Sequence, residues 1–150
     1  MKINFYILFF VFFLFGCSYE SIYSTKKTSF SILSLDVQNK NVLTSQITRA
    51  LKAYKNSSGS RQFSLEIKAE KEKIVTSKDS KGNIKSYKLI IKCNYRIFEE
   101  GKIKKNNEKI ESFVFNNDAN KFKLKKYESS IETTLVGKII EEIILELYSL

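Results

Sequence analysis

The hydrophobic residues of this chain follow two spacings, one typical of strands and one typical of helices. Apolar and polar side chains alternate over residues 63–70 and again over 87–97, which predicts two strands with one buried face each. A shorter strand is expected over 30–37, with a bulge at Leu33 where the alternation changes phase. A less regular strand follows the second alternating run and ends at 113–115. The pattern therefore predicts four strands.

Two other segments repeat their apolar residues every three to four positions, which is the period of a helix. The first follows the capping residues at 38–41 and continues to about Tyr54. The second is longer and runs from about Ala119 to the carboxyl terminus, after N-cap candidates at 116–118. Its apolar stripe consists of Tyr127, Ile131, Leu135, Val136, Ile139, Ile140, Ile143, Ile144 and Leu147. Glutamates dominate its polar side, which favours packing on a sheet over lying on a membrane.

The predicted order is strand, helix, strand, strand, strand, helix. The helix between the first two strands makes a crossover, so these strands should be parallel, whereas the turns near 78–83 and 99–102 should form hairpins. The fold class expected is α+β, a two-layer sandwich with two helices on one face of a four-stranded mixed sheet. Residues 30–150 should form this single domain.

The amino-terminal segment has the features of a secretory signal. A short basic region is followed by an unbroken apolar run over 5–15, whose 11 residues are too few to span a bilayer. The sequence Leu14-Phe15-Gly16-Cys17 then resembles the bacterial lipobox, although Phe15 is larger than the residue usual at its position. We therefore expect a lipoprotein signal peptide at 1–16, a lipidated tether at 17–29, and diacylglycerol and an N-acyl chain on Cys17.

Charge and cysteine content restrict the partners further. The formal net charge of +10 is compatible with an anionic partner, and equally with a Lys-rich composition that has no specific ligand. A secreted chain does not meet nucleic acid, so nucleic-acid binding is not expected. The second cysteine, Cys93, falls on the apolar side of the strand over 87–97, where a buried structural thiol is expected.

The residues that most enzymes use are scarce. The chain has no histidine, its five glycines form no phosphate-binding loop, and one free cysteine cannot build a zinc site. We therefore expect a non-enzymatic protein without a metal or a dissociable cofactor.

Together these features resemble the lipopolysaccharide-assembly lipoprotein family, LptE. The resemblance rests on Cys17, on the βαβββα order, on the strand over 88–98 with its turn Glu100-Gly101-Lys102, and on the closing helix. The Gly-Phe and Pro-Leu-Tyr segments common after the family's lipobox are replaced here, and only a tyrosine is kept. Ser18 follows Cys17 in place of the aspartate that retains lipoproteins in the inner membrane, which implies the periplasmic side of the outer membrane.

The resemblance implies that the protein fills the lumen of the outer-membrane β-barrel LptD, helps it to assemble and assists lipopolysaccharide delivery. The alternative is a lipoprotein that binds another envelope protein or component and has no barrel partner. Position alone nominates glycolipid contacts near one predicted hairpin tip, namely Lys71, Lys73, Lys78, Lys81 and Lys85. A solvated hairpin without a ligand remains the other interpretation of these lysines.

Acylation of Cys17 can be tested directly. Radiolabelled palmitate should enter the wild-type protein, and Cys17→Ala should abolish labelling and leave the precursor unprocessed. Labelling that survives the substitution would show that the lipobox interpretation is wrong.

Overall fold

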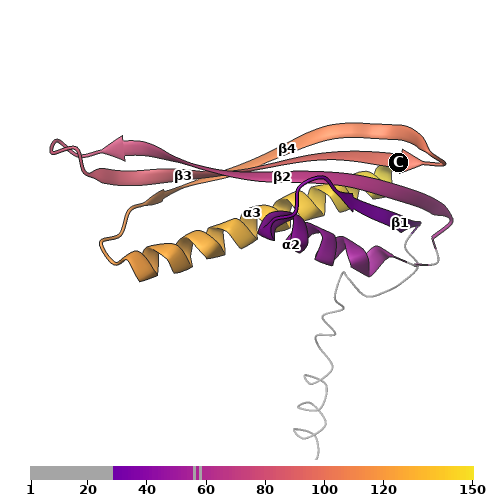
Figure 1. The fold of residues 1–150 in the computed structure, drawn as a ribbon, viewed down its shortest axis with the longest axis horizontal. Coiled ribbons are helices and arrows are strands. Elements are labelled where there is room, and N and C mark those ends of the chain that lie inside the picture. The colour runs from indigo at the N-terminus through magenta and orange to yellow at the C-terminus, as the bar shows by residue number, and fades with distance from the viewer. Residues whose placement is uncertain (1–28, 56, 58) are drawn as a thin grey trace, which may run out of the picture.

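The computed structural model describes residues 29–55, 57 and 59–150. Its elements are β1 (Phe30–Val37), α2 (Val42–Leu51), the 3-10 helix η2 (Lys52–Tyr54), β2 (Arg61–Lys78), β3 (Ile84–Glu99), β4 (Lys102–Asn116) and α3 (Lys121–Ser149). Both helices lie on the same side of the sheet (Figure 1), which confirms the predicted α+β sandwich. The expected signal peptide, tether and Cys17 fall outside the described residues.

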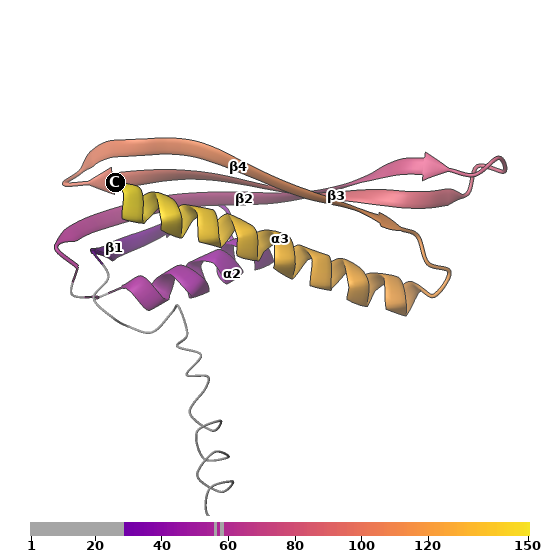
Figure 2. The same cartoon turned by 180° about the vertical axis from the view of Figure 1, so that it is seen from behind.

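The sheet has the order β1-β2-β3-β4 and is mixed, as predicted. β1 pairs with β2 in parallel, and the register shifts between Ile32 and Ser34, where the sequence predicted a bulge at Leu33. The other two pairings are antiparallel. Since β1 has 8 residues and β2 has 18, β1 covers less than half of β2. Beyond β1 the sheet continues as β2, β3 and β4, and the β2–β3 hairpin projects past the end of β4 as an arm at one end of the molecule (Figure 2).

Asparagine side chains mark the point where β1 stops pairing. Asn39 accepts a hydrogen bond from the Ala69 backbone N–H at 3.1 Å and donates one to its carbonyl at 2.8 Å, so its amide occupies the place of another strand residue. Two residues later Asn41 caps α2, because its side chain accepts from the Thr44 N–H while the Thr44 hydroxyl accepts from the Asn41 N–H. The segment 38–41 thus ends the strand and starts the helix.

The turn between β3 and β4 is a two-residue hairpin. Glu100 and Gly101 both have positive φ, 52° and 76°, as the primed turns of such hairpins require. Glu99, which precedes the turn, binds Arg61 of β2 at 2.7 Å and Lys104 of β4 at 3.0 Å. Hydrogen bonds from these two cations lower the pKa of the Glu99 carboxyl to about 2. This carboxylate therefore joins three strands at one end of the sheet.

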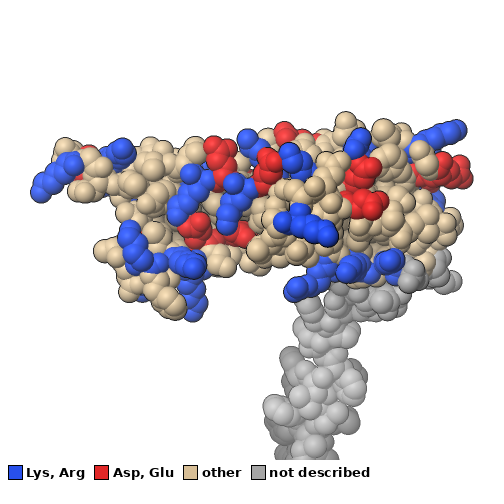
Figure 3. Space-filling model, viewed as in Figure 1, with Lys and Arg blue, Asp and Glu red and all other residues tan. Residues whose placement is uncertain are grey.

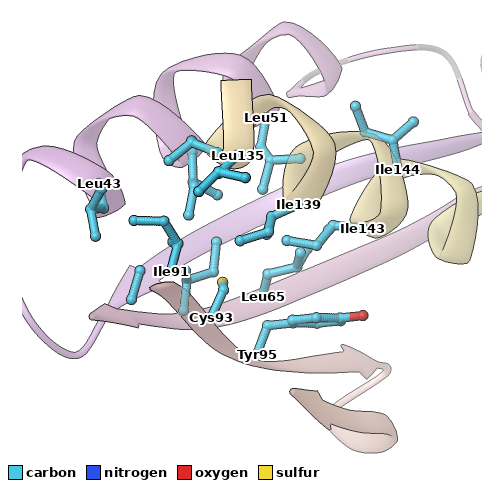
Figure 4. Close-up of a cluster of buried hydrophobic side chains, with 14 of the residues drawn as sticks. Leu43, Leu51, Leu65, Ile91, Cys93, Tyr95, Leu135, Ile139, Ile143 and Ile144 are labelled. Carbon is cyan, nitrogen blue, oxygen red and sulfur yellow. The ribbon is translucent and has the colours of Figure 1, made fainter. Parts of the chain in front are cut away.

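The core lies between α3 and the inner face of the sheet (Figure 4). Ile139 and Ile143 of α3 project onto Ile91 and Cys93 of β3, and all four side chains are fully buried. α2 closes the core from the side with Leu43, Ile47 and Leu51. Cys93 is buried as predicted, and burial raises the pKa of its thiol to about 12. This thiol is therefore protonated and structural at neutral pH.

The start of α3 differs from the prediction by two residues. The helix begins at Lys121 with Asn120 as its N-cap, because the Asn120 side chain accepts from the Lys123 N–H. Asp118 accepts from the Asn120 N–H and holds the preceding residues in a turn, so the predicted start at Ala119 is too early. Tyr127, predicted in the apolar stripe, is half exposed and touches the core only through an edge contact with Phe115.

Adjacent residues of β3 should respond very differently to substitution. Ile91 is fully buried and Lys92 lies on the other face, so Ile91→Lys should bury an unpaired charge and lower the free energy of unfolding by several kcal/mol. Lys92→Ser should cost less than about 1 kcal/mol, since it removes only a surface ion pair with Glu72. Urea unfolding measures both, and equal losses would contradict the assignment of faces.

Candidate functional site

The described residues present surfaces rather than an assembled reaction centre. Among them no three His, Cys, Asp or Glu side chains gather in a way that could hold a metal ion. The one cysteine within this part of the chain is the buried Cys93. No helix in the described ranges is both long and apolar enough to cross a membrane.

Three of the five predicted glycolipid contacts lie together at the β2–β3 hairpin. Lys78, Lys81 and Lys85 are exposed around its tip, at the far end of the arm. Asp79 orders the turn by accepting hydrogen bonds from the backbone N–H groups of Lys81 and Asn83 and from the Asn83 side chain. These bonds lower the pKa of the Asp79 carboxyl. The turn thus holds three cations on an ordered support.

The other two predicted contacts have different surroundings. Lys71 and Lys73 lie on the inner face of β2 and reach α3, where Lys71 binds Glu132 at 2.7 Å and Lys73 binds Glu128 at 2.5 Å. Lys73 also lies over the Tyr87 ring, 4.3 Å from its centroid. The sequence predicted one cluster of all five lysines, but the alternation of side chains along β2 directs Lys71 and Lys73 toward α3. Their charges are already neutralised by partners within the fold.

An open groove lies at the base of the same arm, between the end of β4 and the start of α3. It encloses about 470 Å³ and is lined by Phe113, Phe115, Leu124 and Tyr127 with Lys123 at its side. Asn117 connects it to the hairpin, since its backbone N–H donates to the Lys85 carbonyl and its side chain donates to the Ile84 carbonyl. Apolar side chains and the tip lysines therefore occur at one end of the molecule.

The face of the sheet opposite the helices is not covered by any described residue. Ion pairs cross its middle, between Arg96 and Glu66 and between Lys92 and Glu72. Exposed and half-buried apolar side chains flank these pairs on both sides. Toward the arm they are Ile74, Ile90, Ile110 and Val114, and toward the other end they are Leu33, Phe98 and Ile103.

These apolar residues were not identified from the sequence. A signal for them exists, because Ile74, Ile90 and Ile110 occupy positions where the alternation calls for polar side chains. Their outward direction becomes evident only when the pairing register is known. Single exposed apolar residues are ordinary on proteins, but two groups on one face are typical of a contact surface.

Comparison with solved structures identifies the class of fold. The crystal structure of rare lipoprotein B from Shewanella oneidensis matches with a TM-score of 0.63 and 17% identity, over 79% of this chain and 95% of that one. Lipoprotein B from Nitrosomonas europaea matches with a TM-score of 0.65 and 12% identity, over 82% of this chain and 87% of that one. A minor lipoprotein from Acinetobacter baumannii matches with a TM-score of 0.61 and 13% identity, over 83% and 94%.

The chain therefore has the fold of small bacterial lipoproteins. More particularly, it has the rare lipoprotein B fold, which confirms the LptE-like architecture expected from the sequence. At sequence level the chain matches none of the family models and none of the curated proteins. The similarity is thus carried by the arrangement of strands and helices.

Proposed function

We propose that this protein is an outer-membrane lipoprotein of the LptE type, which works without catalysis as the plug and assembly partner of an LptD-like β-barrel. The observation that carries the proposal is the uncovered sheet face. It combines two apolar groups with a central band of ion pairs. Such a surface suits the polar wall of a barrel lumen better than contact with a lipid interior.

The lipoprotein part of the proposal is supported by the lipobox at Cys17 and by the class of the structural neighbours. Acyl chains on that cysteine would hold the protein at a membrane, since each buried methylene contributes about 0.8 kcal/mol. Ser18 favours the outer membrane, with the domain on the periplasmic side.

Contact with lipopolysaccharide is the second part of the proposal. The lipid portion of this glycolipid carries phosphates and acyl chains, so its recognition needs cations beside an apolar surface. The arm supplies both, with Lys78, Lys81 and Lys85 at its tip and the groove of Phe113, Phe115 and Tyr127 at its base. Lys71 and Lys73 belong to the proposed contact only if their partners on α3 release them.

The uncovered face would also suit a different envelope protein. A lipoprotein that binds such a partner, with no barrel, would use the same apolar groups. The two proposed functions differ in the partner that should stay bound to this protein when the membrane is dissolved in detergent.

A barrel partner should be recovered directly. The protein, purified in mild detergent, should carry one heat-modifiable outer-membrane barrel in a one-to-one ratio, and depletion should reduce the amount of that folded barrel specifically. Ile110→Lys should weaken this association because it places a charge among apolar contacts, whereas Lys68→Ser on the same face should not. Purification with a soluble envelope protein in place of a barrel would favour the alternative.

The glycolipid contact can be tested separately by exchanging the tip lysines. Replacing Lys78, Lys81 and Lys85 together by Ser should weaken the binding of purified lipopolysaccharide, and the difference should shrink as salt rises, since charges are screened beyond about 10 Å at 0.1 M. The matched control is Lys71→Ser with Lys73→Ser, which should reduce thermal stability but leave binding unchanged, because Glu132 and Glu128 already occupy these lysines. Unchanged binding in the tip variant at low salt would remove the tip from the proposed site.

A further inference from the structure

Among the residues that the structure describes, most of the cations without an ion pair lie on the helical side of the molecule. Four of the five acidic residues of α3 face the sheet, where Glu128, Glu132, Glu142 and Glu146 bind lysines of β2 and β4. By contrast, no acidic residue occurs in 37–65 or in 119–127. The first segment includes α2 and the second contains the first two turns of α3. The outward sides of α2 and of the first two turns of α3 are therefore basic, whereas the later part of α3 exposes Glu141.

The cations of these two segments point away from the core. They are Lys40, Arg49, Lys52, Lys55, Lys121, Lys123, Lys125 and Lys126, and all are exposed. None of the eight forms an ion pair with a residue in the described part of the chain. In Figure 3 Lys and Arg residues line the lower, helical edge of the molecule without acidic neighbours, whereas those over the sheet lie among acidic residues.

An exposed aromatic ring lies at the centre of the basic group on α3. Phe122 is 79% exposed, the largest exposure among the large hydrophobic residues described. It precedes the buried Leu124 by two residues, which places it roughly 200° around the helix and therefore on the outward side. Lys126, one turn later, lies beside it, and Lys121 and Lys125 flank it. On α2 the exposed Val42 and Arg49 are two helical turns apart, so both lie on the outward side of this helix.

We propose that the helical side, through Phe122 with Lys121, Lys125 and Lys126 of α3 and Arg49 and Lys52 of α2 and η2, docks on an anionic phospholipid surface. An apolar ring surrounded by lysines is suited to a membrane interface, where the ring enters the acyl boundary and the ammonium groups stay among the phosphates. The cations are distributed over two helices and not around an enclosed cavity, which fits an extended lipid surface better than one small ligand.

The proposed lipid anchor is compatible with this orientation. The tether predicted at 17–29 joins the domain at β1, and Phe30 of β1 stacks on Tyr54 of η2 with 5.4 Å between ring centroids. The chain thus enters the domain beside α2, so an acylated Cys17 and the docked helices would approach the same bilayer. The docking concerns the protein at the membrane before it enters a barrel, so it rests on neither the barrel partner nor the glycolipid contact.

The absence of tryptophan in this chain allows a site-specific optical test. The chain from residue 17, with Cys17→Ser to remove acylation, is mixed with phosphatidylcholine vesicles that contain phosphatidylglycerol and no glycolipid. Phe122→Trp should then show emission at shorter wavelength and quenching by brominated lipid. Ile110→Trp, which is exposed on the opposite side of the sheet, should show neither. An unshifted Phe122→Trp, or equal shifts at both positions, would overturn the proposal.

Replacing lysines on each surface by serine tests whether the helical side or the hairpin tip binds the vesicles. Each lysine near an anionic membrane strengthens binding about fivefold, so replacing Lys121, Lys125 and Lys126 by Ser should reduce vesicle partitioning about a hundredfold at low salt. The control, Lys78, Lys81 and Lys85 to Ser, removes the same charge and should leave vesicle binding close to wild type. If the tip variant loses vesicle binding and the helix variant keeps it, the helical side is not the docking surface, whatever the result with lipopolysaccharide or the barrel.

Discussion

The contact between α3 and the inner face of β3 organises this protein, because it is where the longest helix and a central strand bury their apolar sides together. Ile139 and Ile143 fit against Ile91 and Cys93, and the flanking glutamates of α3 reach lysines on β2 and β4. Apolar burial provides most of the stabilisation, while the ion pairs along the borders fix which glutamate meets which lysine. The same arrangement leaves the opposite face of the sheet and the outward sides of the helices free to bind.

This division explains why charge alone says little about function here. Many lysines of the chain form ion pairs within the fold, including Lys71 and Lys73. Their charges are neutralised there and do not contribute to binding a ligand. Most of the lysines without an ion pair in the described part of the chain form two groups, one at the tip of the arm and another on the helical side. One small domain therefore presents two separate basic surfaces.

Sequence periodicity was sufficient for the architecture. The alternation over 63–69 and 87–97 defined the buried faces of β2 and β3, and the crossover around α2 required β1 to run parallel to β2. Periodicity could not assign partners across the sheet, because register depends on which strands meet. Continued alternation puts Lys71 and Lys73 on the inner face of β2, but only the packing of α3 shows that Glu132 and Glu128 bind them. The groove formed by Phe113, Phe115 and Leu124 likewise had no linear signature.

The side-chain amide of Asn39 affects where the domain unfolds locally. It terminates the pairing of β1 at Ala69, so from there to the tip β2 pairs with β3 alone among the described strands. Backbone hydrogen bonds in this half are bordered by water, whereas those near Phe63 and Ile67 lie between two strands. Local opening is easier where fewer buried contacts must be broken, so amide exchange should be graded along a single strand. The domain thus combines a stiff half, where the chain enters, with a compliant half that carries the hairpin.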